Sequence, residues 1–289
     1  MNAQLALALI PVLSLIALGA LLSRTTDYFK GPAVSGLVTT VGIPALLLHS
    51  VLSLKMDAAL MGKLAAVTLL WLIVMALVTA AALAMARQPV RPYLAALVNP
   101  NTGNMGIPVC YALFGPAAVA PAMVISSVIQ ISHFTLGIGC LSGNWSLNAL
   151  LKNAPLLALA AGFALTATHS TLPEPVMNTL AMLGGITVPV MLMQLGSSVA
   201  GLNLKQGKNL LRPVAFGLYR PLAGVAVAGA LLLLISLPGQ QAQIFMVQCA
   251  MPVAVLSYVM AVKYEGPSDD IAVSILLSLP VSLLVAGML

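Results

Sequence analysis

The sequence predicts an all-α membrane protein that crosses the bilayer many times, and three observations support this class. Apolar residues make up 61% of the 289 residues, whereas charged residues make up only 6%. Soluble domains contain about 45–50% apolar and about 25% charged residues, so this surface cannot face water. The third observation is that the apolar residues form long runs, each about as long as a membrane-spanning helix of ~20 residues.

Ten such runs are separated by short connections, which leave no room for a soluble domain. The first run differs from a secretory signal peptide, because no Lys or Arg precedes it and the first cation is Arg24. We therefore expect a retained first span. The predicted spans cover residues 5–22, 33–53, 64–86, 93–114, 117–140, 154–169, 177–200, 213–236, 242–262 and 270–288.

Lys and Arg in the connections predict the orientation, since cytoplasmic loops of membrane proteins are enriched in both. With the N-terminus outside, the inner connections hold nine of the twelve cations and the outer ones hold Lys55 and Lys63. The remaining cation, Arg220, falls within a span. We therefore expect both termini on the outer side. The cations stand singly, with no basic patch, which argues against nucleic-acid binding.

Proline spacing predicts that the chain consists of two related halves. Pro44 and Pro189 lie 145 residues apart, and Pro108 and Pro252 lie 144 apart, each about half the chain length. Five spans per half place the second half upside down, which is the inverted repeat common among secondary transporters. The two expected five-helix repeats are residues 1–144 and 145–289.

The fourth predicted span contains a segment that does not suit a helix. Residues 98–108 (VNPNTGNMGIP) include two prolines, two glycines and three asparagines. Proline lacks an N–H donor, glycine permits unusual dihedral angles, and asparagine is costly in hydrocarbon unless paired. We expect a helix broken near the bilayer midplane, with Pro252 breaking its partner span. The half-helix after each break begins with a positive dipole end, so two such ends predict an anion site.

These segments resemble the auxin efflux carrier family, which includes plant PIN carriers and bacterial permeases for small organic acids. The resemblance rests on residues 101–108 (NTGNMGIP), 42–48 (GIPALLL), 250–252 (AMP) and 220–222 (RPL). It implies a fold like that of the bile-acid symporters, in which the fourth and ninth helices cross at their breaks.

The resemblance also implies how the helices divide into working parts. Spans 1, 2, 6 and 7 would form a scaffold, spans 3–5 and 8–10 would form a moving transport bundle, and two copies would form a homodimer. Plant members often carry a long loop between the fifth and sixth spans, whereas here that connection covers only residues 141–153. The chain therefore looks like a bacterial member of the inner (plasma) membrane.

Polar residues near the two predicted breaks are the candidate substrate ligands. Asn101 and Asn104, on either side of Gly103, would contact the substrate or cap the backbone inside the break. Ser257 and Tyr258 are the first polar groups after the proline of the ninth span. The residues expected to shape the crossover are Pro108, Gly106 and Pro252.

Other polar residues within spans are further candidates. His49 and Ser50 follow the proline of the second span by about one turn, and Gln194 stands 145 residues after His49. His133 in the fifth span would bind substrate, carry a proton or make an interhelical hydrogen bond. Arg220 would supply the counter-charge for an anionic substrate or extend to the cytoplasmic interface.

The acidic residues narrow the function by their positions. All six lie in connections or at span ends, so coupling through a buried carboxylate is not expected. The three cysteines stand singly in apolar runs without metal-binding spacing, and we expect no metal and no cofactor.

We interpret the chain as a secondary carrier of small organic anions, such as mono- or dicarboxylates, in a lipid bilayer. An intramembrane enzyme, a channel and a transporter-like receptor are the alternatives. The sequence contains no HExxH motif, no paired mid-span aspartates and no nucleophile elbow, which argues against the enzyme. An inverted repeat with one crossover does not suit the ring of equivalent segments that a channel needs.

Overall fold

The computed structural model describes residues 3–29, 32–53, 58–143, 154–168, 170–201 and 210–289. The α-helices of the first half are α1 (Ala3–Leu22), α2 (Pro32–Leu37), α3 (Ile43–Leu52), α4 (Ala58–Met85), α5 (Val90–Val98), α6 (Ile107–Phe114), α7 (Val119–Ser132) and α8 (Ile138–Ser142). Those of the second half are α10 (Ala154–Ala167), α11 (Glu174–Gly185), α12 (Thr187–Gly201), α13 (Leu211–Leu232), α14 (Gly239–Cys249), α15 (Val255–Lys263) and α16 (Ser268–Ala286).

Short helical turns of other types connect several of these helices. The wide π-type turns η1 (Val38–Gly42), η2 (Thr102–Gly106) and η4 (His133–Gly137) precede α3, α6 and α8, respectively. A 3₁₀ turn, η3 (Pro116–Ala118), precedes α7. Turns of the π type are often found at functional sites in helices, and two of these three lie beside the cavity described below.

Five helical stretches among the described residues are long and apolar enough to cross a membrane. They are Ala59–Met85, Val119–Ser142, Glu174–Gln194, Leu211–Leu232 and Ser268–Ala286. The all-α, multi-pass class predicted from the sequence is thereby confirmed. The fourth and ninth predicted spans are not in this set, because α5 is separated from α6 and α14 from α15.

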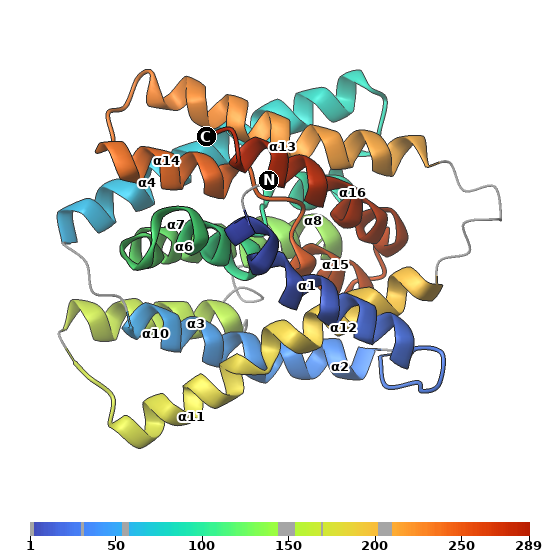
Figure 1. Ribbon diagram of the computed structural model, residues 1–289, viewed down its shortest axis with the longest axis horizontal. Coiled ribbons are helices and arrows are strands. Elements are labelled where there is room, and N and C mark those ends of the chain that lie inside the picture. The colour runs from blue at the N-terminus through green and yellow to red at the C-terminus, as the bar shows by residue number, and fades with distance from the viewer. Residues whose placement is uncertain (1–2, 30–31, 54–57, 144–153, 169, 202–209) are drawn as a thin grey trace.

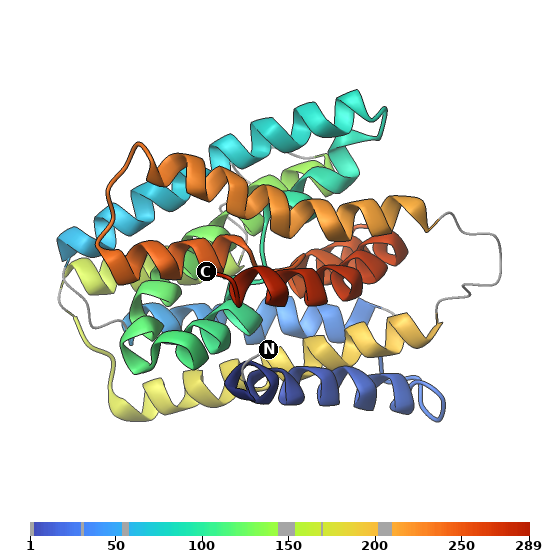
Figure 2. The same cartoon turned by 45° about the horizontal axis from the view of Figure 1, so that its top comes forward.

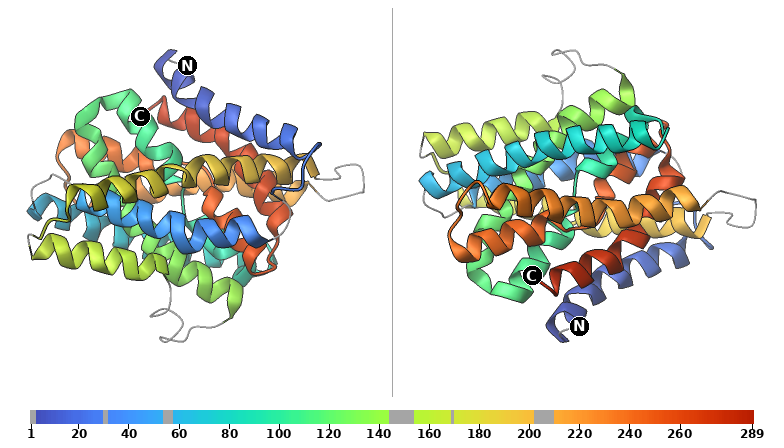
Figure 3. Two further views of the ribbon diagram at one scale, coloured as in Figure 1. Left: turned by 90° about the horizontal axis from the view of Figure 1, so that it is seen from below. Right: turned by 90° about the horizontal axis from the view of Figure 1, so that it is seen from above.

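The helices lie in two groups on either side of the molecule's centre. In Figure 1, α2, α3, α10, α11 and α12 occupy the lower half with α1, whereas α4, α13 and α14 occupy the upper half, and α6, α7, α15 and α16 lie between them. Packing of α4 on α7 and of α13 on α16 joins these middle helices to the upper group. The separation persists after the rotation in Figure 2, and the two groups come forward in turn in the opposite views of Figure 3. The strongest helix–helix packing stays within a group, such as α1 on α12 and α13 on α16.

Small residues allow α1 and α12 to approach each other closely. A Cβ atom built on Gly19 would lie 1.9 Å from the carbonyl oxygen of Met193, and one on Gly196 would lie 1.9 Å from that of Ile16. Helix interfaces in membranes commonly use small residues for such backbone contact. The two glycines therefore determine how α1 sits on α12.

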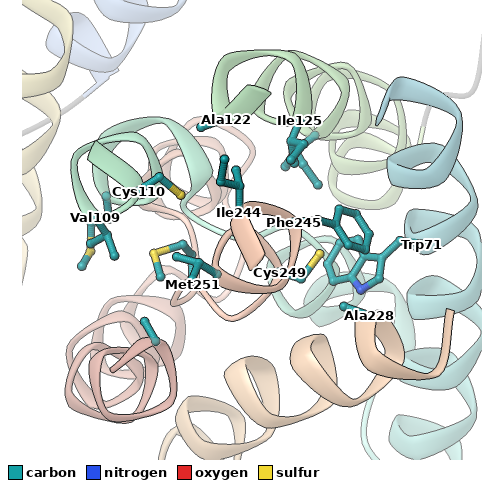
Figure 4. Packing of buried hydrophobic residues seen from close by; sticks show 14 of the residues in the cluster. Trp71, Val109, Cys110, Ala122, Ile125, Ala228, Ile244, Phe245, Cys249 and Met251 are labelled. Atoms are coloured by element: carbon teal, nitrogen blue, oxygen red, sulfur yellow. The ribbon is translucent and has the colours of Figure 1, made fainter. Parts of the chain in front are cut away.

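The largest apolar cluster holds the helix that precedes the second break. Trp71 of α4, Ile125 of α7 and Ala228 of α13 surround Ile244 and Phe245 of α14 (Figure 4). All five side chains are fully buried. The Trp71 indole also donates a 3.0 Å hydrogen bond to the carbonyl of Gly224. Close packing of this kind fixes α14, and with it the place where the helix ends.

Candidate substrate site

Two interrupted helices from opposite halves of the chain meet at their breaks. The Asn101 N–H donates a 2.8 Å hydrogen bond to the carbonyl of Pro252. Pro100 and Val253 form an antiparallel bridge beside it. The Val253 N–H is satisfied in turn by Ser278 Oγ of α16, at 3.1 Å. One donor of the first break is therefore bonded to an acceptor of the second, and the next donor is bonded to α16, as membrane depth requires.

Proline chemistry explains where the first of these helices ends. Asn99, the residue before Pro100, has φ −90° and ψ 114°, the extended conformation that a following proline favours. Pro108 lies in the first turn of α6, where a helix needs no N–H donor. The segment that pairs with the break at Pro252 is therefore centred on Pro100. Pro108, which the half-length spacing matched to Pro252, lies eight residues later.

A cavity of about 120 Å³ lies at the crossover, and the starts of both following helices line it. Gly103 and Asn104 of η2 contribute from one break, and Ala254 and Leu256 at the start of α15 contribute from the other. The first N–H groups of a helix lack intrahelical partners and carry a partial positive charge. Two positive helix ends therefore border one cavity.

Asn101 adds a hydrogen-bond donor to this wall. It lines the cavity and is only 5% exposed. Its Nδ2 atom has no hydrogen-bond partner among the described residues. A buried donor without a partner costs about 1–3 kcal/mol, so a ligand oxygen that accepts from it would recover that free energy.

Helix α7 supplies a second polar wall. Ser126 Oγ accepts a 3.2 Å hydrogen bond from Thr102 Oγ1 and a 3.4 Å one from Gln130 Nε2. His133 Nδ1 donates to the carbonyl of Ile129 at 3.3 Å. Its Nε2 lies 3.3 Å from Ser257 Oγ of α15. Two separate hydrogen-bonded groups therefore link α7 to the first break and His133 of η4 to the second half-helix of the crossover.

Several residues predicted from the sequence do meet in the cavity. Asn101, Gly103, Asn104, Ser50 and His133 all line it. Sequence reasoning missed four further polar lining residues, which are Thr102, Ser126, Ser127 and Gln130. A signal was present, because the polar residues of the fifth span recur every three or four positions, the spacing of one helix face.

The other predicted ligands lie outside the cavity lining. His49 is half-buried in α3, whereas Gln194 in α12 and Tyr258 in α15 are buried at 1% and 3% exposure. Ser257 contacts the cavity only through its hydrogen bond to His133. Gly106 serves packing, since a Cβ atom there would meet the side chain of Gln248 on α14.

Arg220 binds the two helix ends that precede the breaks. It is fully buried, and its Nη1 donates to the carbonyl of Cys249 at 2.8 Å. Its Nη2 donates to the carbonyl of Val98 at 3.3 Å, and the guanidinium carbon stands 5.5 Å from the Trp71 ring centroid. Val98 and Cys249 are the last residues of α5 and α14, so Arg220 binds both negative helix ends.

The fold and this site together define a class of protein. Many apolar helices, two of them interrupted and crossed beside a polar cavity, are features of membrane transporters.

Comparison with known families agrees with this class. A model of the membrane transport protein family matches residues 5–144 and 142–288. The chain belongs to this family, and its resemblance to the auxin efflux carriers is confirmed. An uncharacterized transporter of Methanocaldococcus jannaschii is 28% identical over 201 residues, which cover 65% of this chain and 63% of the relative. The alignment therefore spans less than two thirds of that relative's length.

Proposed function

We propose that this membrane transport protein is a secondary carrier that moves small organic anions by alternating access. The observation that carries the proposal is that two positive helix ends, one from each break, border the same small cavity. Asn101 offers an unpartnered donor in the same wall. An anion accepts hydrogen bonds from such groups and is stabilised by both helix dipoles.

The proposed architecture is ten spans arranged as two inverted five-helix repeats, residues 1–144 and 145–289. Each half contributes one interrupted helix to the crossover, which is consistent with a duplicated unit. The two regions matched by the family model meet at residues 142–144, close to the proposed boundary.

The proposed movement takes place between the two helix groups. Ser50 of α3 and Val188 of α12 line the cavity from the group that would act as the scaffold. Asn104 and Ser126 line it from the group that would act as the transport bundle. Because both groups contribute to the cavity walls, a displacement of one against the other would open the cavity to either side.

We further propose a homodimer in a bacterial inner membrane, with both termini outside. In Figure 1 the ends of α1 and α4 and the start of α13 lie at the right, and the start of α11 and the end of α13 lie at the left. Arg24 follows α1, Arg87 follows α4 and Arg212 lies at the start of α13, so all three cations belong to the ends at the right. This favours the right-hand side as cytoplasmic.

Counterflow in proteoliposomes tests the carrier function. Purified protein is reconstituted in vesicles loaded with an unlabelled short-chain carboxylate, and uptake of the radiolabelled compound is followed against protein-free vesicles. A carrier gives saturable uptake that the internal substrate accelerates. Flux that does not saturate would indicate a channel, and binding without any protein-dependent uptake would indicate a receptor.

A further inference from the structure

The charge balance of the crossover cavity limits the substrate that it can hold. Among the described lining residues there is no Lys, Arg, Asp or Glu. The two helix ends each carry roughly half a positive charge, so together they balance about one negative charge. Both helices are long enough to carry such a partial charge at their first turn, since η2 with α6 covers residues 102–114 and α15 covers Val255–Lys263.

Among the described residues, Arg220 is the one fully buried Lys or Arg, and it is engaged at the helix ends that precede the two breaks. The hydrogen bonds of Arg220 go to the carbonyls of Val98 and Cys249, at the opposite helix ends. His133 lines the cavity, and a neutral ring meets both of its contacts. Its Nδ1–H donates to Ile129 and its Nε2 accepts from the Ser257 hydroxyl.

The cavity also has two unlike ends. Most of its polar residues belong to the first break and α7, such as Asn101 and Ser126, and the others are Ser50 of α3 and His133 of η4. The wall formed by α3 and α12 is mostly apolar and includes Ile43, Leu46 and Val188. A carboxylate fits the first end and a short alkyl chain fits the second, whereas a second carboxylate against the apolar wall would be buried without a partner.

The volume sets the length of that alkyl chain. An apolar cavity of about 150 Å³ takes up benzene, which has six heavy atoms. The crossover cavity of about 120 Å³ is slightly smaller. It therefore suits a molecule of roughly four to six heavy atoms, such as acetate, propionate or butyrate.

We infer that the substrate is a monocarboxylate of about two to four carbon atoms, held with its carboxylate against the helix ends and its alkyl chain against α3 and α12. The inference rests on the proposed function and narrows its substrate class.

Thermal stabilisation of the detergent-purified protein at pH 7.5 tests the inference on a matched series of small acids. Propionate should raise the unfolding temperature. Propionamide, which has nearly the same shape without the charge, should not. Succinate and hexanoate should need concentrations at least about tenfold higher than propionate for the same shift, because a buried unpaired carboxylate or an overlong chain costs more than 1.4 kcal/mol.

The possible outcomes separate the inference from the proposed function. Tighter binding of succinate or malonate than of propionate would overturn the inference and leave an organic-anion carrier. Equal shifts with propionamide and propionate would also overturn it, because the helix ends would then not be recognising charge. No stabilisation and no counterflow with any mono- or dicarboxylate would remove both proposals.

A charge added to the apolar wall provides a second test. Val188→Lys places a cation opposite the helix ends, and Val188→Met is the uncharged control of similar length. The lysine variant should shift the binding preference from propionate toward succinate by about tenfold or more, and the methionine variant should not. Ser50→Lys, on the same helix group, tests the same point if Val188→Lys does not fold, and an unchanged preference in a folded lysine variant contradicts the inference.

Discussion

At the scale of single residues, Arg220 links two helices at the points where they stop. A helix leaves its last carbonyl groups without intrahelical partners, and at membrane depth water does not replace them. The guanidinium group has several donors in a fixed plane, which lets it bind the Val98 and Cys249 carbonyls together. A position at the cytoplasmic interface, considered from the sequence, does not match full burial, and Arg220 is not among the residues that line the cavity.

Arg220→Gln should reduce counterflow more than Arg220→Lys, because lysine keeps the charge between the helix ends and glutamine does not. Each charge-assisted hydrogen bond contributes about 1.5–3 kcal/mol, so both variants should also lower the unfolding temperature. The matched control is Arg87→Gln, on the exposed surface just after α4. Equal and mild effects of all three substitutions would show that the buried contacts of Arg220 contribute little.

Asn104 lines the cavity at the start of the first interrupted helix. Asn104→Ala should weaken substrate binding by about tenfold or more without preventing folding, since a hydrogen bond to a charged group is worth about 1.5–3 kcal/mol. Titration of the ligand-induced thermal shift measures the change. Asn178→Ala, on the exposed surface of α11, is the control and should bind normally. Unchanged affinity in Asn104→Ala would place the substrate elsewhere.

At the scale of elements, the crossover shows what proline spacing can and cannot reveal. The sequence predicted a broken fourth helix from two prolines, two glycines and three asparagines, and α5 does end within that segment. Pro100 and Pro108 both lack an N–H donor, so local chemistry does not decide which one stands at the crossing. That choice depends on the pairing with Val253, which is a tertiary contact.

Pro100→Ala should therefore reduce counterflow more than Pro108→Ala. Alanine at position 100 permits α5 to continue as a helix and weakens the extended segment that pairs with Val253. Alanine at position 108 adds an N–H group inside the helical stretch 102–114 and leaves the extended segment that pairs with Val253 unchanged. Initial counterflow rates per folded protein give the comparison, and a larger loss in Pro108→Ala would favour the half-length pairing of Pro108 with Pro252.

The packing of α1 on α12 provides a test of the scaffold. Gly196→Ala puts a Cβ atom 1.9 Å from a backbone carbonyl oxygen, so the helices must separate. Overpacking of this kind costs about 1–3 kcal/mol and should lower the unfolding temperature. Gly62→Ala in α4, where a Cβ atom meets nothing within 4 Å, should leave it unchanged or raise it. An undisturbed Gly196→Ala variant would mean that α1 and α12 are farther apart.

At the scale of the whole molecule, the cavity lies between two groups of helices that come from both halves of the chain. Composition and span length were enough to predict a multi-pass helical protein, because these properties depend on the sum of many residues. The sites of individual contacts were less predictable. Ser126 and Gln130 line the cavity, whereas Arg220 binds the carbonyls where α5 and α14 end, because of how whole helices pack.

Alternating access can be followed with a cysteine in the cavity wall. Ser50→Cys, in a variant lacking the three native cysteines, should react with a small membrane-impermeant thiol reagent added from either side of the membrane, and substrate should slow the reaction. Ser53→Cys, at the exposed end of α3, should react from one side only and regardless of substrate. Reaction of Ser50→Cys from a single side under all conditions would contradict the proposed movement.

The bond between the Asn101 N–H and the Pro252 carbonyl has a consequence for how relatives of this chain can diverge. Only main-chain atoms take part, so most substitutions at either position leave the join intact. Ligand-facing side chains nearby are then able to change without loosening the centre of the molecule. A family built on such a join is well suited to acquire new cargoes while keeping one frame.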